Sequence, residues 1–80
     1  MVRVYSIQGC PYCVKAKALL RQRGIQFQEI DVTSRPEMRQ WLVQQTGRKT
    51  VPQIFINDKC IGGASDLEAL DSAGMLMRML

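Results

Sequence analysis

Three cysteines and no histidine define the covalent chemistry open to this 80-residue chain. Without an imidazole, a cysteine–histidine nucleophile pair and a histidine general base are excluded. Three thiols are one ligand short of a four-coordinate zinc site, unless a carboxylate or a second chain completes it. Cys10 and Cys13 form a C-x-x-C motif, whereas Cys60 stands alone. Reversible dithiol–disulfide exchange is therefore expected at Cys10 and Cys13.

The C-x-x-C pair lies at the start of a predicted helix. The β-rich run 2–7 is followed by a Gln8-Gly9 turn, and Pro11 suits the first position of a helix. Both sulfurs then share one helical face, within the Cα separation of about 4.4–6.8 Å that a disulfide needs. As the N-cap, Cys10 meets unpaired backbone N–H groups and the positive end of the helix dipole, which favour its thiolate. Cys10 is predicted to attack and Cys13 to resolve.

The remaining elements follow from hydrophobic periodicity and from turn residues. We expect a strand at 2–7, a helix at 11–23, a strand at 25–32, a helix at 35–46, a hairpin at 53–61 and a helix at 66–73. Ser34 and Ser65 each precede a glutamate by three residues, which predicts them as N-caps. The order βαβ, α, ββα predicts a mixed sheet with a parallel first pair of strands, an antiparallel hairpin and helices packed on it.

Composition indicates one small domain spanning residues 1–80. The net charge of +4 comes from scattered basic residues and does not resemble a nucleic-acid-binding tail. No apolar run approaches the ~20 residues needed to cross a bilayer. The odd number of cysteines is unlike a secreted disulfide framework. A cytoplasmic protein is expected, with neither nucleic acid nor membrane as a partner.

Two apolar features have structural explanations. Cys60 falls in a predicted strand and is expected to be a small core or edge residue rather than a catalyst. Leu76 and Leu80 are spaced four residues apart in an apolar tail, and both are expected to cover the edge of the core.

Three motifs in order resemble those of dithiol glutaredoxins of the small bacterial type: Cys10-Pro11-Tyr12-Cys13, Thr50-Val51-Pro52, and Gly62-Gly63 with Ser65-Asp66-Leu67. The resemblance covers essentially the whole chain. It implies an α/β, thioredoxin-like fold with a four-stranded mixed sheet in the order 2-1-3-4 and three or more helices. It also implies glutathione-dependent reduction of protein disulfides and of glutathione mixed disulfides.

The same resemblance implies the partners of the reaction. Glutathione would be a co-substrate regenerated by glutathione reductase, and no cofactor would be tightly bound. The protein would act as a monomer on disulfide-containing or glutathionylated proteins, with ribonucleotide reductase and peroxidases among the substrates used by the family.

Carried over by position, the resemblance assigns the nucleophile to Cys10 and the resolving thiol to Cys13. Glutathione would contact these residues: Tyr12, Arg39, Lys49, Thr50, Val51, Pro52, Gly63, Ser65 and Asp66. A cis Val51–Pro52 bond would let the Val51 backbone pair with glutathione, and Gly63 would allow its close approach. The start of the last helix would take the γ-glutamyl end, and Arg39 with Lys49 would take the glycyl carboxylate.

The sequence departs from the family pattern before the nucleophile. Many members have a basic residue three positions before it, where this chain has Ile7. The positive charge near the site is therefore expected from Arg39 and Lys49, with Lys15 as a further candidate.

Two other functions of related proteins remain open. A redoxin recharged by thioredoxin reductase typically has a Trp-Ser-Gly-Phe-type segment where this chain has Gly62-Gly63-Ala64-Ser65. A carrier of an iron–sulfur cluster, bridged by Cys10 and glutathione, mostly has Gly-Phe-Ser after the cysteine, where this chain has Pro11-Tyr12-Cys13. Both differences favour the glutathione-coupled oxidoreductase.

Overall fold

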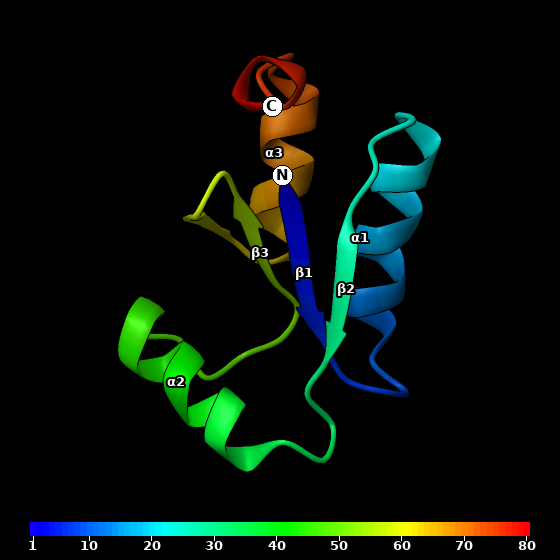
Figure 1. Ribbon diagram of the computed structural model, residues 1–80. Coiled ribbons are helices and arrows are strands. Elements are labelled where there is room, and N and C mark those ends of the chain that lie inside the picture. Colours follow the sequence, from blue (N-terminus) through cyan, green and yellow to red (C-terminus); the bar gives the residue numbers. More distant parts are fainter.

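The computed structural model describes residues 1–80 and has its main elements in the predicted order (Figure 1). The strands are β1 (Val2–Ser6), β2 (Gln28–Asp31), β3 (Gln53–Ile56) and β4 (Lys59–Gly62). The helices are α1 (Pro11–Gln22), α2 (Pro36–Thr46) and α3 (Ala64–Ser72), followed by a 3₁₀ turn, η1 (Met77–Met79). The sheet order is β2-β1-β3-β4, with β1 parallel to β2 and the other pairs antiparallel. The predicted thioredoxin-like fold is confirmed.

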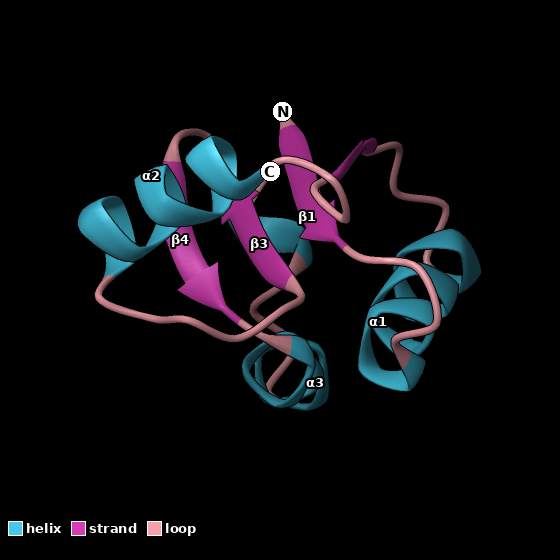
Figure 2. Cartoon of the chain, turned by 90° about the horizontal axis from the view of Figure 1, so that it is seen from below, coloured by secondary structure: helices cyan, strands magenta, loops and turns pink.

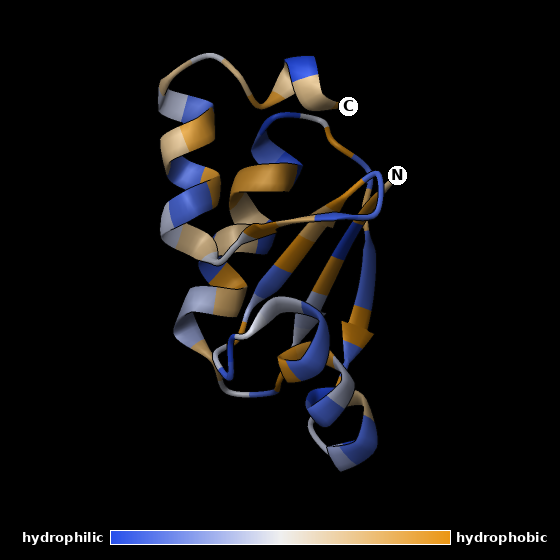
Figure 3. Cartoon of the chain, turned by 90° about the vertical axis from the view of Figure 1, so that its left-hand side faces the viewer, coloured by the Kyte–Doolittle hydropathy of each residue, from blue (hydrophilic) through white to orange (hydrophobic).

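The helices cover both faces of the sheet. Figure 2 shows α2 on one side of the strands and α1 with α3 on the other. Successive side chains of a strand point to opposite faces, so Val2 and Val4 of β1 pack in one core cluster with Leu20 of α1, while Tyr5 packs in a second with Leu42 of α2. The alternation of hydrophobic and hydrophilic positions is visible along the strands in Figure 3. Both core clusters therefore pack against β1, and the loop to Cys10 follows the end of this strand.

The second strand is shorter than predicted. Ile25 and Phe27 lie outside β2, although Ile25 is buried and Phe27 packs against the larger core cluster. The Ile25 amide donates to the Leu20 carbonyl at 2.9 Å, so it completes the end of α1 instead of joining the sheet. The hydrophobic pattern therefore predicted correctly that Ile25 and Phe27 pack against the core, but it predicted wrongly that they belong to the strand.

Both predicted serine N-caps are wrong. The N-cap of α2 is Arg35, because a residue before proline is disfavoured in the helical region, and Pro36 occupies the first helical turn. The N-cap of α3 is Gly63, two residues before the predicted N-cap Ser65. Asp66, at the third helical position, accepts a hydrogen bond from the Gly63 amide at 2.9 Å. The carboxylate that closes this helix start is therefore Asp66 rather than Glu68.

The hairpin is confirmed, and the tail only in part. Asn57 and Asp58 connect β3 to β4 with positive φ angles of 51° and 68°, as a tight two-residue turn requires. Cys60 is half-buried in the edge strand β4, as predicted. Leu76 is fully buried, but Leu80 is 48% exposed, so only the former covers the core.

None of the helices is long and apolar enough to span a membrane.

Candidate active site

Cys10 is the N-cap of α1, as the sequence predicted. Its Sγ accepts a hydrogen bond from the Cys13 amide at 3.3 Å, so an unpaired donor of the first turn points at the sulfur. On its other side the sulfur lies 3.9 Å from the Val51 carbonyl oxygen. The Val51–Pro52 bond is cis, as expected. Cys10 is therefore placed between a helix start and the loop that leads into β3.

Cys13 lies beneath Cys10 on the sheet-facing side of α1. It is 1% exposed, and it belongs to the buried face of the helix with Ala16 and Leu20. Burial and its hydrogen bond with Cys10 raise the pKa of the Cys13 thiol to about 11. Cys13 is thus a protonated thiol at neutral pH, while Cys10 is the more accessible of the two. This asymmetry suits an attacking thiol and a resolving thiol.

A groove of about 320 Å³, a volume within the range of small-molecule sites, lies beside Cys10, whose sulfur contacts the lining residue Val51. It is lined by Tyr12, Arg48, Thr50, Val51, Pro52, Gly63, Ala64, Ser65 and Asp66. Seven of the predicted glutathione contacts are therefore brought together by three segments that are distant in the sequence. Tyr12 is 66% exposed at the rim. Arg39 and Lys49 are exposed but are not part of this lining.

Asp66 organises the end of the groove that α3 forms. Its carboxylate accepts from the Gly63 amide and, at 3.2 Å, from Nη1 of Arg48. These two contacts hold the pKa of Asp66 below its ordinary value, so the groove has an anionic group beside the start of α3. The first-turn amides of a helix attract anions, and the Asp66 carboxylate attracts cations. A ligand with an anionic and a cationic group close together could therefore bind at the start of α3.

Gly62 is the crowded glycine of this segment. Its φ of +115° is rare for other residues, and a Cβ there would overlap the Asp66 carboxylate and lie 3.0 Å from Nη1 of Arg48. At Gly63 the nearest atom to a Cβ is the Pro52 carbonyl oxygen at 3.4 Å, an ordinary contact.

Sequence reasoning missed Arg48 and Gln53. Arg48 bonds Asp66 across the groove, and its only signal was a place in the basic pair before Thr50. Gln53 is buried in β3, and its Nε2 donates to the carbonyls of Arg48 at 2.9 Å and Thr50 at 3.1 Å. Gln53 therefore fixes the loop that carries one wall of the groove. A glutamine in an apolar strand gives no sequence sign of this role.

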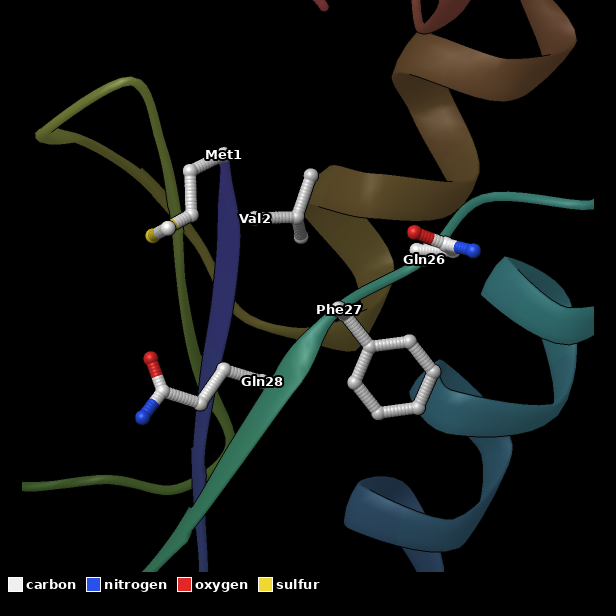
Figure 4. A pocket seen from close by; sticks show the side chains of 5 residues that line it. All are labelled: Met1, Val2, Gln26, Phe27 and Gln28. Atoms are coloured by element: carbon white, nitrogen blue, oxygen red, sulfur yellow. The ribbon is translucent and has the colours of Figure 1, made fainter.

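A second hollow lies at the opposite end of β1, away from the cysteines (Figure 4). It has a volume of about 340 Å³ and is lined by Met1, Val2, Gln26, Phe27 and Gln28. None of these side chains is a nucleophile or carries a charge. This hollow therefore offers no side chain for thiol–disulfide chemistry.

The family model for glutaredoxin matches residues 2–61. The chain belongs to the glutaredoxin family. A glutaredoxin from Pseudomonas aeruginosa is 46% identical over 79 residues, covering 99% of this chain and 94% of that protein. Glutaredoxin 3 of Escherichia coli K12 is also 46% identical, covering 99% of this chain and 95% of that protein. This glutaredoxin is accordingly a thiol–disulfide oxidoreductase.

Solved structures agree with this assignment. The crystal structure of a buckwheat glutaredoxin–glutathione complex superposes with a TM-score of 0.94 at 34% identity, covering 99% of this chain and 74% of the other. The solution structure of a glutaredoxin from Brucella melitensis gives a TM-score of 0.89 at 47% identity, covering 99% and 86%. The fold of this glutaredoxin is that of the family over its whole length.

Proposed function

We propose that this glutaredoxin uses glutathione to reduce protein disulfides and glutathione mixed disulfides through Cys10 and Cys13. The observation that carries the proposal is the place of Cys10, whose sulfur lies at a helix start beside a groove that contains the Arg48–Asp66 ion pair and the first residues of α3. A tripeptide with two carboxylates and one ammonium can bind to these charged groups and to the helix start. The glutathione complex of the buckwheat relative supports the same ligand.

In the first step, the Cys10 thiolate attacks one sulfur of the substrate disulfide. A bond forms between that sulfur and Cys10, and the other substrate sulfur leaves as a thiolate and takes up a proton. When the substrate is a glutathione mixed disulfide, Cys10 becomes glutathionylated. A second glutathione then attacks this mixed disulfide, which releases glutathione disulfide and restores Cys10.

Protein disulfides require the second thiol. After Cys10 has attacked, Cys13 loses its proton and attacks the Cys10 sulfur, releasing the reduced substrate and closing a Cys10–Cys13 disulfide. Two molecules of glutathione then reduce that disulfide. Since the pKa of the Cys13 thiol is raised to about 11, this closing step is expected to accelerate as pH rises through neutrality.

Bound glutathione is proposed to lie along the groove with its cysteinyl backbone against Val51. Its γ-glutamyl carboxylate would meet the first amides of α3 at Ser65, and its ammonium would meet Asp66. Its glycyl carboxylate would extend beyond the groove towards Arg39 and Lys49, which carry no ion pair of their own. The support for this orientation is that Asp66 lines the groove at the start of α3, whereas Arg39 and Lys49 are exposed outside the lining.

Replacing Cys13 with serine should separate the two activities. Removal of glutathione from a small mixed disulfide needs only Cys10 and is expected to survive. Reduction of a protein disulfide needs Cys13, and its rate is expected to fall at least tenfold. The mixed disulfide between Cys10 and the substrate is then resolved by glutathione from solution instead of by a thiol of the same molecule. Steady-state turnover of both substrates measures the split, and loss of both activities in a folded variant would contradict the assigned roles.

Replacing Lys49 with glutamate should raise the KM for a glutathionylated peptide by roughly three- to tenfold, because attraction of the glycyl carboxylate becomes repulsion. Lys59→Glu is the matched control, since Lys59 is an exposed lysine of β4 outside the groove. The decisive comparison is with Arg48→Glu. A raised KM for that variant together with an unchanged KM for Lys49→Glu would move the carboxylate site from Lys49 to Arg48.

A further inference from the structure

A lysine occupies the sheet-facing side of α1, one helical turn after Cys13. The buried residues of this helix are Cys13, Ala16 and Leu20, and Lys17 follows Cys13 by four residues, which places it on the same face. The Lys17 side chain is only 17% exposed, whereas that of Lys15, on the outer flank, is 64% exposed. A cation on the inner face of a helix is unusual and calls for a partner.

That partner is a carboxylate on the sheet. Nζ of Lys17 lies 2.6 Å from Oε2 of Glu29 in β2, and the same oxygen accepts from Oγ of Ser6 at 2.8 Å. Ser6 is 1% exposed at the end of β1, directly before the loop that leads to Cys10. The two contacts hold the pKa of Glu29 below its ordinary value. A network of three side chains therefore fixes the Lys17 ammonium between α1 and the sheet.

Lys17 also lies near Cys13 on this face. Helical side chains lean towards the helix N-terminus, which directs the stem of Lys17 towards the turn that carries Cys13. Burial and Cys10 raise the pKa of the Cys13 thiol, while a hydrogen bond with the Ile7 backbone and, to a smaller extent, the Lys17 charge lower it. From the neighbouring strand, Glu29 faces Lys17, and Arg21 of α1 acts on Glu29.

We propose that Lys17 promotes deprotonation of Cys13 in the resolving step and that Glu29, positioned by Ser6, limits this effect by neutralising Lys17. The inference rests on the proposed function. In that step the Cys13 proton passes to solvent, the Cys13 thiolate bonds to the Cys10 sulfur, and the bond from Cys10 to glutathione breaks. Glutathione leaves as a thiolate with the electron pair of that bond. The charge that Lys17 stabilises is the one on Cys13 before attack.

The test measures closure of the Cys10–Cys13 disulfide directly. Reduced protein is mixed with glutathione disulfide, quenched with acid at short times and alkylated, and mass spectrometry follows the conversion of glutathionylated protein to the internal disulfide at several pH values. In Glu29→Gln, the unopposed Lys17 should move the pH profile to lower pH, by at most about one unit. The closing rate near pH 7 should rise by up to about threefold, since the gain in thiolate is partly offset by lower nucleophilicity.

Removal of the lysine should have the opposite effect. In Lys17→Met the profile should move to higher pH, by at most about one unit, and the rate near pH 7 should fall by up to about threefold, while Lys17→Arg should stay close to the parent protein. Glu29→Gln keeps the shape and most hydrogen-bonding capacity of the side chain, so its profile decides the matter if Lys17→Met lowers folding stability.

The control pair lies on the same helix. Lys15 and Glu68 form an ion pair at 3.3 Å on the outer flank, so Lys15→Met and Glu68→Gln should leave the profile unchanged. In a Cys13→Ser background, Glu29→Gln should leave turnover of a small mixed disulfide unchanged, because Cys10 alone carries that reaction. A changed turnover in that background, or an unmoved closing profile in the dithiol protein, would overturn the inference. Absence of mixed-disulfide turnover in the Cys13→Ser protein itself would instead overturn the proposed function.

Discussion

Replacing Cys10 with serine should lower thiol–disulfide turnover by a factor on the order of 10³ or more, because a hydroxyl cannot replace a thiolate as nucleophile at neutral pH. The sulfur of Cys10 accepts a hydrogen bond from the Cys13 amide at 3.3 Å and lies beside the groove. No other thiol lines the groove to take over the attack. Cys13 is buried and its raised pKa keeps it protonated. Steady-state reduction of a glutathione mixed disulfide measures the loss.

Cys60→Ser is the matched control for this substitution. Cys60 is half-buried in the edge strand β4 and packs beside the smaller core cluster, away from the groove lining. Turnover of Cys60→Ser should stay within about twofold of the parent protein. Activity retained in Cys10→Ser but lost in Cys60→Ser would show that Cys60, and not Cys10, is the nucleophile.

Replacing Gly62 with alanine should damage both stability and glutathione binding. The new Cβ would overlap the Asp66 carboxylate and would force a residue with a side chain to adopt a φ of +115°. Strain of this kind costs about 1–3 kcal/mol of unfolding free energy. Because Asp66 must move away from the Gly63 amide and from Arg48, the KM for a glutathionylated peptide should rise at least tenfold.

Gly74→Ala separates strain from displacement of the carboxylate. Gly74 also has a positive φ, +71°, but nothing lies within 4 Å of a Cβ built there. It should lose stability in chemical denaturation without a change in KM. A Gly62→Ala protein with a KM equal to that of Gly74→Ala would show that Asp66 does not hold the substrate.

The fold could be predicted largely because its local signals agree. Pro11 after Cys10 marks a helix start, and Asn57-Asp58 between apolar runs marks a tight turn; both occur where expected. The boundaries that failed depend on tertiary context. Ser34 could not cap a helix because Pro36 displaced its start, and Ile25 bonds to the end of α1 rather than to β1. Neither competition is visible in hydrophobic periodicity.

The candidate site was predictable where a motif carries its own chemistry. Cys10, Cys13 and the Thr50-Val51-Pro52 segment are recognisable from their spacing, and the structure brings them together. The missing contributions come from side chains whose partners are distant in the sequence. Arg48 reaches Asp66 across 18 residues, and Lys17 meets Glu29 only because β2 packs beneath α1. Charged residues of this kind are numerous, and only the fold selects those that pair.

The most direct measurement of the central claim is turnover of a small glutathione mixed disulfide with each of two reducing systems, followed as NADPH consumption. With glutathione and glutathione reductase, the rate should rise with glutathione concentration and should vanish both without glutathione and in Cys10→Ser. With thioredoxin reductase and no glutathione, the rate should remain at background. Sustained turnover with thioredoxin reductase alone would contradict a glutathione-dependent oxidoreductase.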